Sequence, residues 1–404
     1  MTASRSNWTG VALGLTLASY AAYQQFKMPP ALPLMLDAYG YDSRLAGAFM
    51  SAYAVAGLLL SLVLGRVIAQ RGSGGPAAAA LALTVVGSVA TMLVPESGAL
   101  VLAARVLEGV GFAVLAIAGP VLANANASAR HLPLVIAGTA AWIPIGQLVA
   151  VLSAGPLFRL AGWPGLWWLG LAMAAALALW LAAIRAGRWV DLGGRRATAG
   201  GADEGRAAPG LDQPQKLALA LTGLVFMLWS AQYFAYMTWL PQYLVSALGL
   251  SVEGALRGYA LPVGVLLLSI LATGQLLSRG AAPGVLLVGG LAAQALTWAA
   301  LPFVGGGWLG AASLVLYGAG GGVVPTCLFA MPSRIAGRGD GAARAFGIMM
   351  TGRNSGVLIG PILLAQTFEL AGSWDWAAPV MGTATAVALV VAVWLASKVR
   401  GADA

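Results

Sequence analysis

The chain has 404 residues, of which 60% are hydrophobic and only 9% are charged. A water-soluble protein carries roughly a quarter charged residues because its surface faces water, so this composition excludes a soluble globular protein and indicates lipid as the surrounding solvent. The formal net charge of +9 does not gather into a basic patch with interleaved aromatic residues, which argues against a nucleic-acid partner. The basic residues lie instead in short breaks between long apolar runs, as in polytopic membrane proteins.

Apolar runs long enough to cross a bilayer as helices, about 20 residues each, recur along the whole chain. The first run lacks a small-residue cleavage site, so it predicts a retained helix rather than a signal peptide. The predicted fold class is therefore an all-α membrane protein with twelve transmembrane helices. The predicted spans lie near residues 8–31, 44–66, 76–95, 99–124, 133–157, 164–186, 216–239, 255–278, 283–303, 307–331, 343–367 and 375–398.

The distribution of positive charge predicts the orientation in the membrane. With the N-terminus in the cytoplasm, most of the 22 Lys and Arg residues fall on the cytoplasmic side, as the positive-inside rule requires. We therefore expect a multi-pass protein of a bacterial inner membrane with both termini in the cytoplasm. The polar stretch between the sixth and seventh spans predicts a flexible linker over 187–215. It separates an N-terminal bundle of six helices (1–186) from a C-terminal bundle of six (216–404).

Short segments of the first half return in the second half in the same order. Phe158–Gly162 returns as Phe368–Gly372, and Leu32-Pro33 returns as Leu240-Pro241. One such match would be weak in a chain dominated by Gly, Ala and Leu, but several in order indicate an internal repeat. The two bundles are therefore predicted to be pseudo-symmetric.

The first span carries polar residues on one helical face. Tyr20, Tyr23, Gln24 and Lys27 lie three, four or seven positions apart and so point the same way. A charged side chain in the bilayer core costs a few kcal/mol or more, so it invites a functional explanation. We expect this face to bind a polar solute. The alternative is that Lys27 extends along the helix to the lipid headgroups.

The fourth span holds Arg105 and Glu108, which are three residues apart and can neutralise one another in place. A structural pair is the simpler interpretation. The sharper one makes Glu108 a carboxyl group that takes up and releases a coupling proton. Either role makes these residues coupling or conformational candidates.

The seventh span has a second polar and aromatic face, formed by Trp229, Gln232, Tyr233 and Tyr236. It mirrors the Tyr20–Lys27 face of the first span, as the repeat predicts. Two such faces meeting across the pseudo-symmetry axis would form a cavity. Further candidates for its lining are Gln147 and Tyr317, whereas Trp239 and Tyr243 are predicted to belong to an interfacial aromatic belt.

The motifs of the chain resemble those of the major facilitator superfamily of secondary transporters. Arg105–Gly111 is similar to the arginine–glycine motif of that family's fourth helix, and Gly65–Gly72 lies where the family carries its signature loop. The loop departs from the pattern because Ala69 stands in place of the usual aspartate and Gln70 in place of a basic residue. The glycine- and proline-rich fifth span is loosely similar to the motif of drug/proton antiporters.

The prolines at the end of the first helix, Pro29-Pro30 and Leu32-Pro33, resemble anion-handling branches such as oxalate/formate exchangers and cyanate-type permeases. The resemblance implies alternating access around a midplane site, with close helix contacts at glycines of the fourth and tenth helices. It also implies that Arg353, deep in the eleventh span beside Asn354, contacts a substrate carboxylate with its planar guanidinium.

These observations favour a secondary transporter, monomeric and without a cofactor, for a small organic anion such as a monocarboxylate. Coupling is expected by proton symport or by anion exchange. The alternative is proton-coupled efflux of lipophilic or cationic drugs, for which Glu108 would be the cation-binding acid. No Ser/His/Asp set, metal-ligand spacing or nucleotide loop is present, and the single histidine (His131) and cysteine (Cys327) exclude a His/Cys metal site. The chain is therefore not predicted to be an enzyme.

Overall fold

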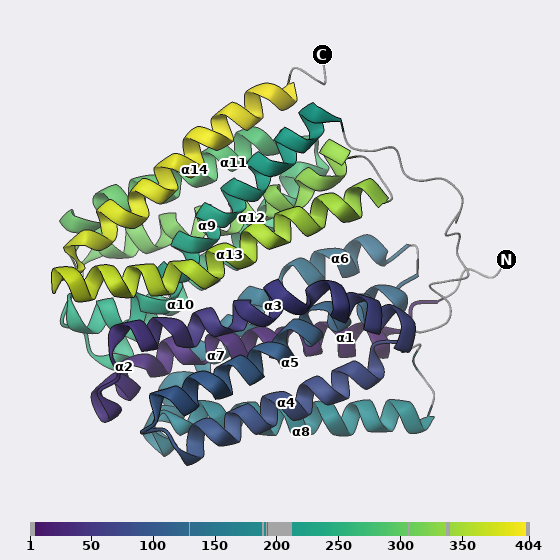
Figure 1. Ribbon diagram of the computed structural model, residues 1–404, viewed down its shortest axis with the longest axis horizontal. Helices are drawn as coiled ribbons and strands as arrows, with labels where there is room; N and C mark the ends of the chain where they lie inside the picture. Colours follow the sequence, from purple (N-terminus) through teal and green to yellow (C-terminus); the bar gives the residue numbers. More distant parts are fainter. Residues whose placement is uncertain are drawn as a thin grey trace. The chain divides into compact units, whose positions relative to one another are not determined.

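The computed structural model describes residues 5–128, 130–187, 190, 192, 212–305, 307–336 and 340–400, and in these residues it is all-helical (Figure 1). The N-terminal helices are α1 (Trp8–Phe26), α2 (Met28–Tyr39), α3 (Ser43–Arg71), α4 (Gly74–Leu93), α5 (Gly98–Ala125), α6 (Leu132–Ala140), α7 (Trp142–Ala161) and α8 (Pro164–Gly187). The C-terminal helices are α9 (Gln213–Ser246), α10 (Val252–Ser278), α11 (Pro283–Ala300), α12 (Trp308–Ala336), α13 (Asp340–Ala371) and α14 (Ala377–Arg400). Two 3-10 turns, η1 (Leu301–Phe303) and η2 (Trp374–Trp376), adjoin α11 and α14.

Eleven helical segments in the described residues are long and apolar enough to span a membrane. They correspond to α3, α4, α5 and α7 to α14, with η1 and η2 continuing the spans of α11 and α14. Helix α1 is not among them, because Tyr20, Tyr23, Gln24 and Gln25 reduce its hydropathy. The predicted fold class, an all-α multi-pass membrane protein, is confirmed.

Two of the predicted spans are broken into two helices. The span predicted over 8–31 divides at Lys27 into α1 and α2, and the span over 133–157 divides at Ala141 into α6 and α7. Proline explains both breaks, because it has no N–H to donate to the carbonyl four residues earlier. Pro29 and Pro30 stand at the start of α2, and Pro144 stands in the first turn of α7.

The chain forms two compact units, one containing residues 1–41 and 52–205 and the other containing 42–51 and 206–404. In the first unit, α1 packs on α5 and α7, and α4 packs on α5 and α8 (Figure 1). In the second, α9 lies along α13, α10 lies along α12, and α11 packs on α12 and α14. Most of the predicted linker, 187–215, falls outside the described residues.

Glycines bring the helices of each unit into close contact. On α12, an added Cβ at Gly318 would lie 2.4 Å from the Pro262 carbonyl oxygen, and one at Gly320 would lie 2.5 Å from the Gly290 carbonyl oxygen. A real Cβ does not approach an oxygen so closely, so only glycine permits these backbones to meet. The close approach expected at the glycines of the tenth span is therefore present, against α10 on one side and α11 on the other.

The α9–α13 contact is built in the same way. Gly352, Gly356 and Gly360 are spaced four residues apart on α13 and so form one stripe. A Cβ at Gly356 would lie 2.1 Å from the Met227 carbonyl oxygen, and one at Gly360 would lie 2.0 Å from that of Ala231. The stripe fixes the rotation of α13, and with it the place of Arg353 in the second unit.

Candidate functional site

The break between α1 and α2 exposes a backbone carbonyl that a side chain must satisfy. Pro29 has no N–H, so the carbonyl of Gln25 lacks its usual helical donor. Arg105 of α5 supplies that donor, with Nη2 at 3.0 Å from the Gln25 oxygen and Nη1 at 3.0 Å from the Gln24 oxygen. Arg105 of α5 therefore supplies the hydrogen bond that Pro29 of α2 cannot donate.

Glu108 is held between two buried cations. Its Oε2 accepts from Arg105 Nη1 at 2.7 Å, and its Oε1 accepts from Lys27 Nζ at 2.8 Å. All three side chains have no exposed surface. The predicted Arg105–Glu108 pair is thus present, and Lys27 joins it. The alternative in which Lys27 extends to the headgroups is wrong, because its ammonium group lies in the interior of the first unit.

The ammonium group of Lys27 is fully engaged. Its three donors reach Glu108, Ser88 Oγ at 2.8 Å and the side-chain oxygen of Gln24. The ring of Trp167 lies 4.7 Å from the same nitrogen and adds a cation–π contact. In this conformation a solute could bind Lys27 directly only by displacing one of these partners. The cluster of two cations and one carboxylate itself keeps one excess positive charge.

The tyrosines of α1 have different surroundings. The Tyr20 hydroxyl bonds Thr84 Oγ1 at 3.0 Å and accepts from Gln24 Nε2, so it extends the Lys27 cluster. The Tyr23 hydroxyl instead donates to the Leu166 carbonyl at 2.6 Å, which turns it away from the cluster toward α8.

The cluster also contains residues that sequence reasoning missed. Tyr53 of α3 has its hydroxyl 2.8 Å from Glu108 Oε2, where it also accepts from Arg105 Nη1 at 3.0 Å. Ser88 of α4 donates to Glu108 Oε1 at 2.7 Å. Both are polar residues in apolar spans, which was the one signal in the sequence that could have found them. Which polar residues meet depends on how each helix is rotated, and the sequence does not give that rotation.

The second unit holds a network of amides and aromatic side chains. Gln232 Nε2 donates to Gln294 Oε1 at 3.1 Å, and Trp229 Nε1 donates to the same oxygen at 2.9 Å. Gln232 Oε1 in turn accepts from Trp298 Nε1 at 2.8 Å and from the Tyr317 hydroxyl at 2.7 Å. The structure thus brings together the predicted residues Trp229, Gln232 and Tyr317. It adds Gln294 and Trp298 of α11, which sequence reasoning missed.

Aromatic stacking supports this network on two sides. Tyr233 stacks on Trp229 with ring centroids 4.9 Å apart, and Tyr236 stacks on Tyr317 at 3.6 Å. Trp298 meets the edge of Tyr236 at 5.4 Å. These rings hold the amide groups in fixed orientations inside an apolar environment.

Arg353 of α13 lies in the second unit and is 7% exposed. Its Nη1 donates to the Asn354 side-chain oxygen at 3.0 Å, and its guanidinium lies 5.4 Å from the ring of Phe234. In the described part of the chain, no Asp or Glu lies within ion-pair distance of this guanidinium. Its charge is therefore not neutralised locally, in contrast to that of Arg105.

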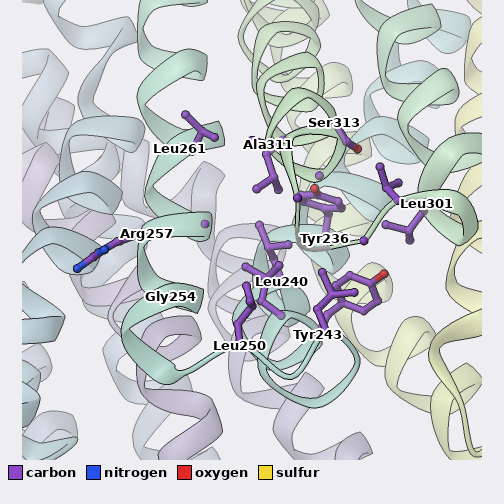
Figure 2. Close-up of a pocket in the computed structure, with 18 residues that line it drawn as sticks. Tyr236, Leu240, Tyr243, Leu250, Gly254, Arg257, Leu261, Leu301, Ala311 and Ser313 are labelled. Carbon is purple, nitrogen blue, oxygen red and sulfur yellow. The ribbon is translucent and has the colours of Figure 1, made fainter.

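A cavity of about 280 Å³ opens beside the amide network in the second unit (Figure 2). Tyr236 and Tyr243 line it together with leucines of α9, α10 and α12, and the side chain of Arg257 points away from it (Figure 2). A second cavity, of about 240 Å³, lies in the first unit beside Tyr20 and Tyr23. Both walls are mostly apolar with a few hydroxyl groups.

The remaining residues singled out from the sequence are Gln147, Tyr243 and Trp239. Gln147 is buried on α7, and Tyr243 lines the larger cavity. The prediction for Trp239 is wrong, because it is buried and donates to the Pro361 carbonyl at 3.0 Å instead of joining an interfacial belt.

A family model described as Major Facilitator Superfamily matches residues 12–343. This range begins within α1, includes α2 to α12 in full and ends in the first residues of α13. No curated protein matches the chain.

Proposed function

The chain belongs to the Major Facilitator Superfamily, and from this premise we propose that it carries a small organic anion, a monocarboxylate, across the membrane by alternating access. The family assignment makes it a multi-pass secondary transporter of small molecules and not an enzyme. The identity of the solute class rests on the charges of the site.

The observation that carries the proposal is the excess of buried positive charge. Among the described residues, the buried charged side chains are Lys27, Arg105, Arg353 and Glu108. The carboxylate neutralises one cation of the first unit, and Arg353 remains without an acidic partner in the second. Buried charges interact strongly at low effective dielectric, so each unit by itself attracts an anion and repels a cation.

Arg353 is the residue best suited to hold the solute carboxylate. A guanidinium presents parallel N–H donors that match the two carboxylate oxygens. The Asn354 oxygen occupies only one of these donors. Lys27, whose donors are all occupied, would contribute mainly through its charge, and Tyr20 and Gln24 would contact the solute only after the Lys27 cluster opens.

The surroundings of Glu108 bear on whether solute transport is coupled to a proton or to a second anion. Two cations and the hydroxyl groups of Ser88 and Tyr53 surround this carboxylate, so its charge is compensated where it stands. Anion exchange needs no titrating carboxylate and agrees with this environment. In a proton symporter, protonation of Glu108 would release Lys27 for the solute. In both cases Arg105 stabilises the break between α1 and α2 through its hydrogen bonds to the backbone carbonyls of Gln24 and Gln25.

Efflux of lipophilic compounds is the second candidate, and the mostly apolar cavity beside Tyr236 favours it. Cationic compounds fit less well, because the acid they would need is paired with two cations. We further propose a monomer in a bacterial inner membrane with both termini in the cytoplasm, and no cofactor or nucleic-acid partner.

The test is uptake of radiolabelled small carboxylates into proteoliposomes. We expect wild-type protein to take up at least one of them, Arg353→Gln to reduce uptake by more than about tenfold, and Arg353→Lys to retain part of it. Lys27→Gln should also reduce uptake, because it removes the excess positive charge of the Lys27–Arg105–Glu108 cluster. A requirement for carboxylate inside the vesicle would identify exchange.

Arg257→Gln is the matched control, because Arg257 is an arginine of the same unit that is largely exposed and paired with Glu253. Its uptake should equal that of wild type. Absence of carboxylate uptake, or equal activity of Arg353→Gln and Arg257→Gln, would reject the anion proposal and leave lipophilic efflux as the better candidate.

A further inference from the structure

In the amide network of the second unit, the positions of the side-chain oxygen and nitrogen of Gln232 and Gln294 are determined by their neighbours. An indole N–H can only donate, so Trp298 identifies the Gln232 atom that it contacts as oxygen, and Trp229 does the same for Gln294. Gln232 must then present its nitrogen to the Gln294 oxygen. The two tryptophans thus exclude the reversed orientation of both amides.

This orientation leaves one donor group without an acceptor. Gln294 Nε2 is buried and has no hydrogen-bond partner among the residues that the structure describes, and the whole Gln294 side chain has no exposed surface. An unsatisfied buried donor costs about 1–3 kcal/mol, and proteins rarely retain one without a reason. The other atoms of the network are paired, so the open position points to an external acceptor.

The space beside this nitrogen is bordered by four helices of the same unit. A Cβ placed on Gly321 of α12 would lie 3.7 Å from Gln294 Nε2 and 3.6 Å from a ring carbon of Tyr233. Its third neighbour is Leu266 of α10, at 3.2 Å. Glycine at position 321 therefore leaves this side of the free amide uncovered by a side chain, and an added Cβ would itself contact the amide.

We propose that Gln294 is a specificity-determining residue that donates a hydrogen bond to an uncharged oxygen of the transported solute. The inference rests on the proposed anion transport and narrows it. The solute is a small carboxylate that carries a second oxygen, a carbonyl or a hydroxyl, in addition to its carboxylate. An unsubstituted alkyl carboxylate leaves Gln294 unpaired and binds less well, because a site built to donate rejects an analogue that cannot accept.

The inference is tested with two probes of equal carbon number in the proteoliposome assay. Pyruvate carries a 2-oxo group, and propionate does not. We expect wild-type protein to prefer pyruvate over propionate by about tenfold, the equivalent of one hydrogen bond. Gln294→Met, which keeps an unbranched side chain of similar length, should abolish the preference, so that the ratio of pyruvate uptake to propionate uptake falls to about one.

Gly321→Ala provides an independent variant, because it leaves every hydrogen bond of Gln294 in place and fills only the space beside Nε2. It should reduce the preference for pyruvate as Gln294→Met does. Gly289→Ala is the matched control, since a Cβ at Gly289 of α11 meets nothing within 4 Å, and it should behave as wild type.

The outcomes separate this inference from the function on which it rests. Carboxylate uptake that depends on Arg353 but does not distinguish pyruvate from propionate overturns the role of Gln294 alone. It would mean that the free amide binds only water. Absence of uptake of both acids by wild-type protein overturns the anion proposal and the Gln294 inference together.

Discussion

The buried polar clusters of the two units satisfy their hydrogen bonds by different means. In the first unit, full charges meet at Glu108, and every donor of Lys27 has a partner. In the second, neutral amides and indoles form the network, and Gln294 Nε2 has no partner in the described part of the chain. Among the described residues of that unit, Arg353 is the buried cation, and the hydrogen bond that it donates goes to a neutral amide oxygen.

The difference follows from what each kind of group costs to bury. An unpaired buried charge costs several kcal/mol, and the Glu108 cluster reduces that cost by pairing its charges with one another. A neutral amide with one free donor costs only about 1–3 kcal/mol, so it can wait for a ligand. The Glu108 cluster thus pairs its charges with one another, whereas the amide network retains one open donor, on Gln294.

The largest effect is expected for Glu108→Gln. Removing the carboxylate leaves Lys27 and Arg105 as like charges in a buried site, which should lower the free energy of unfolding by about 3–5 kcal/mol. The measurement is denaturation in mixed detergent micelles, followed by circular dichroism. Adding Lys27→Met to this variant should recover part of the loss, because it removes one of the two unpaired charges.

A single Glu108→Gln protein as stable as wild type would contradict the comparison. It would show that the first cluster is as tolerant of an unpaired group as the second.

A smaller effect is expected for Trp298→Phe in the amide network. The substitution removes one donor to Gln232 Oε1, but that oxygen still accepts from Tyr317. The expected loss is therefore about 1 kcal/mol in the same denaturation assay. Trp376→Phe shows the effect of the same substitution at a position where the indole is exposed. If Trp298→Phe lowered the free energy of unfolding as much as Glu108→Gln does, the amide network would be as sensitive to a lost partner as the charged cluster.

The smallest effect is expected for Glu253→Gln. This acid pairs with Arg257 at 2.8 Å, but both side chains are largely exposed, and such pairs contribute less than about 1 kcal/mol. The variant should unfold within error of wild type. A marked loss would mean that burial is not what makes the Glu108 cluster sensitive.

Hydropathy and charge distribution predicted the fold class, because a span needs only length and apolar composition. They did not predict the breaks at Lys27 and Ala141, although Pro29, Pro30 and Pro144 were visible signals of a missing N–H. The internal repeat and the division into two six-helix bundles remain predictions. Most of the predicted linker lies outside the described residues.

The candidate site was predicted only in part. Helical spacing found the faces of α1 and α9, and the spacing of Arg105 and Glu108 indicated their pair. It could not find that Lys27 meets Glu108, since that contact depends on the rotations of separate helices. Gln294 and Trp298 are four residues apart in α11, the same spacing as Trp229 and Tyr233, and this polar and aromatic face was an overlooked signal.

The close helix contacts at glycine also determine which genetic changes the protein tolerates. Any change at the first or second base of a glycine codon that encodes an amino acid introduces a side chain. At Gly318, Gly320 and Gly356 that side chain would collide with a backbone oxygen, whereas Gly264 and Gly289 have open space around the missing Cβ. A saturation mutagenesis scan should therefore divide the glycines of these helices into an invariant set at the crossings and a freely varying set elsewhere. Residues of one type, in one kind of helix, would evolve at very different rates.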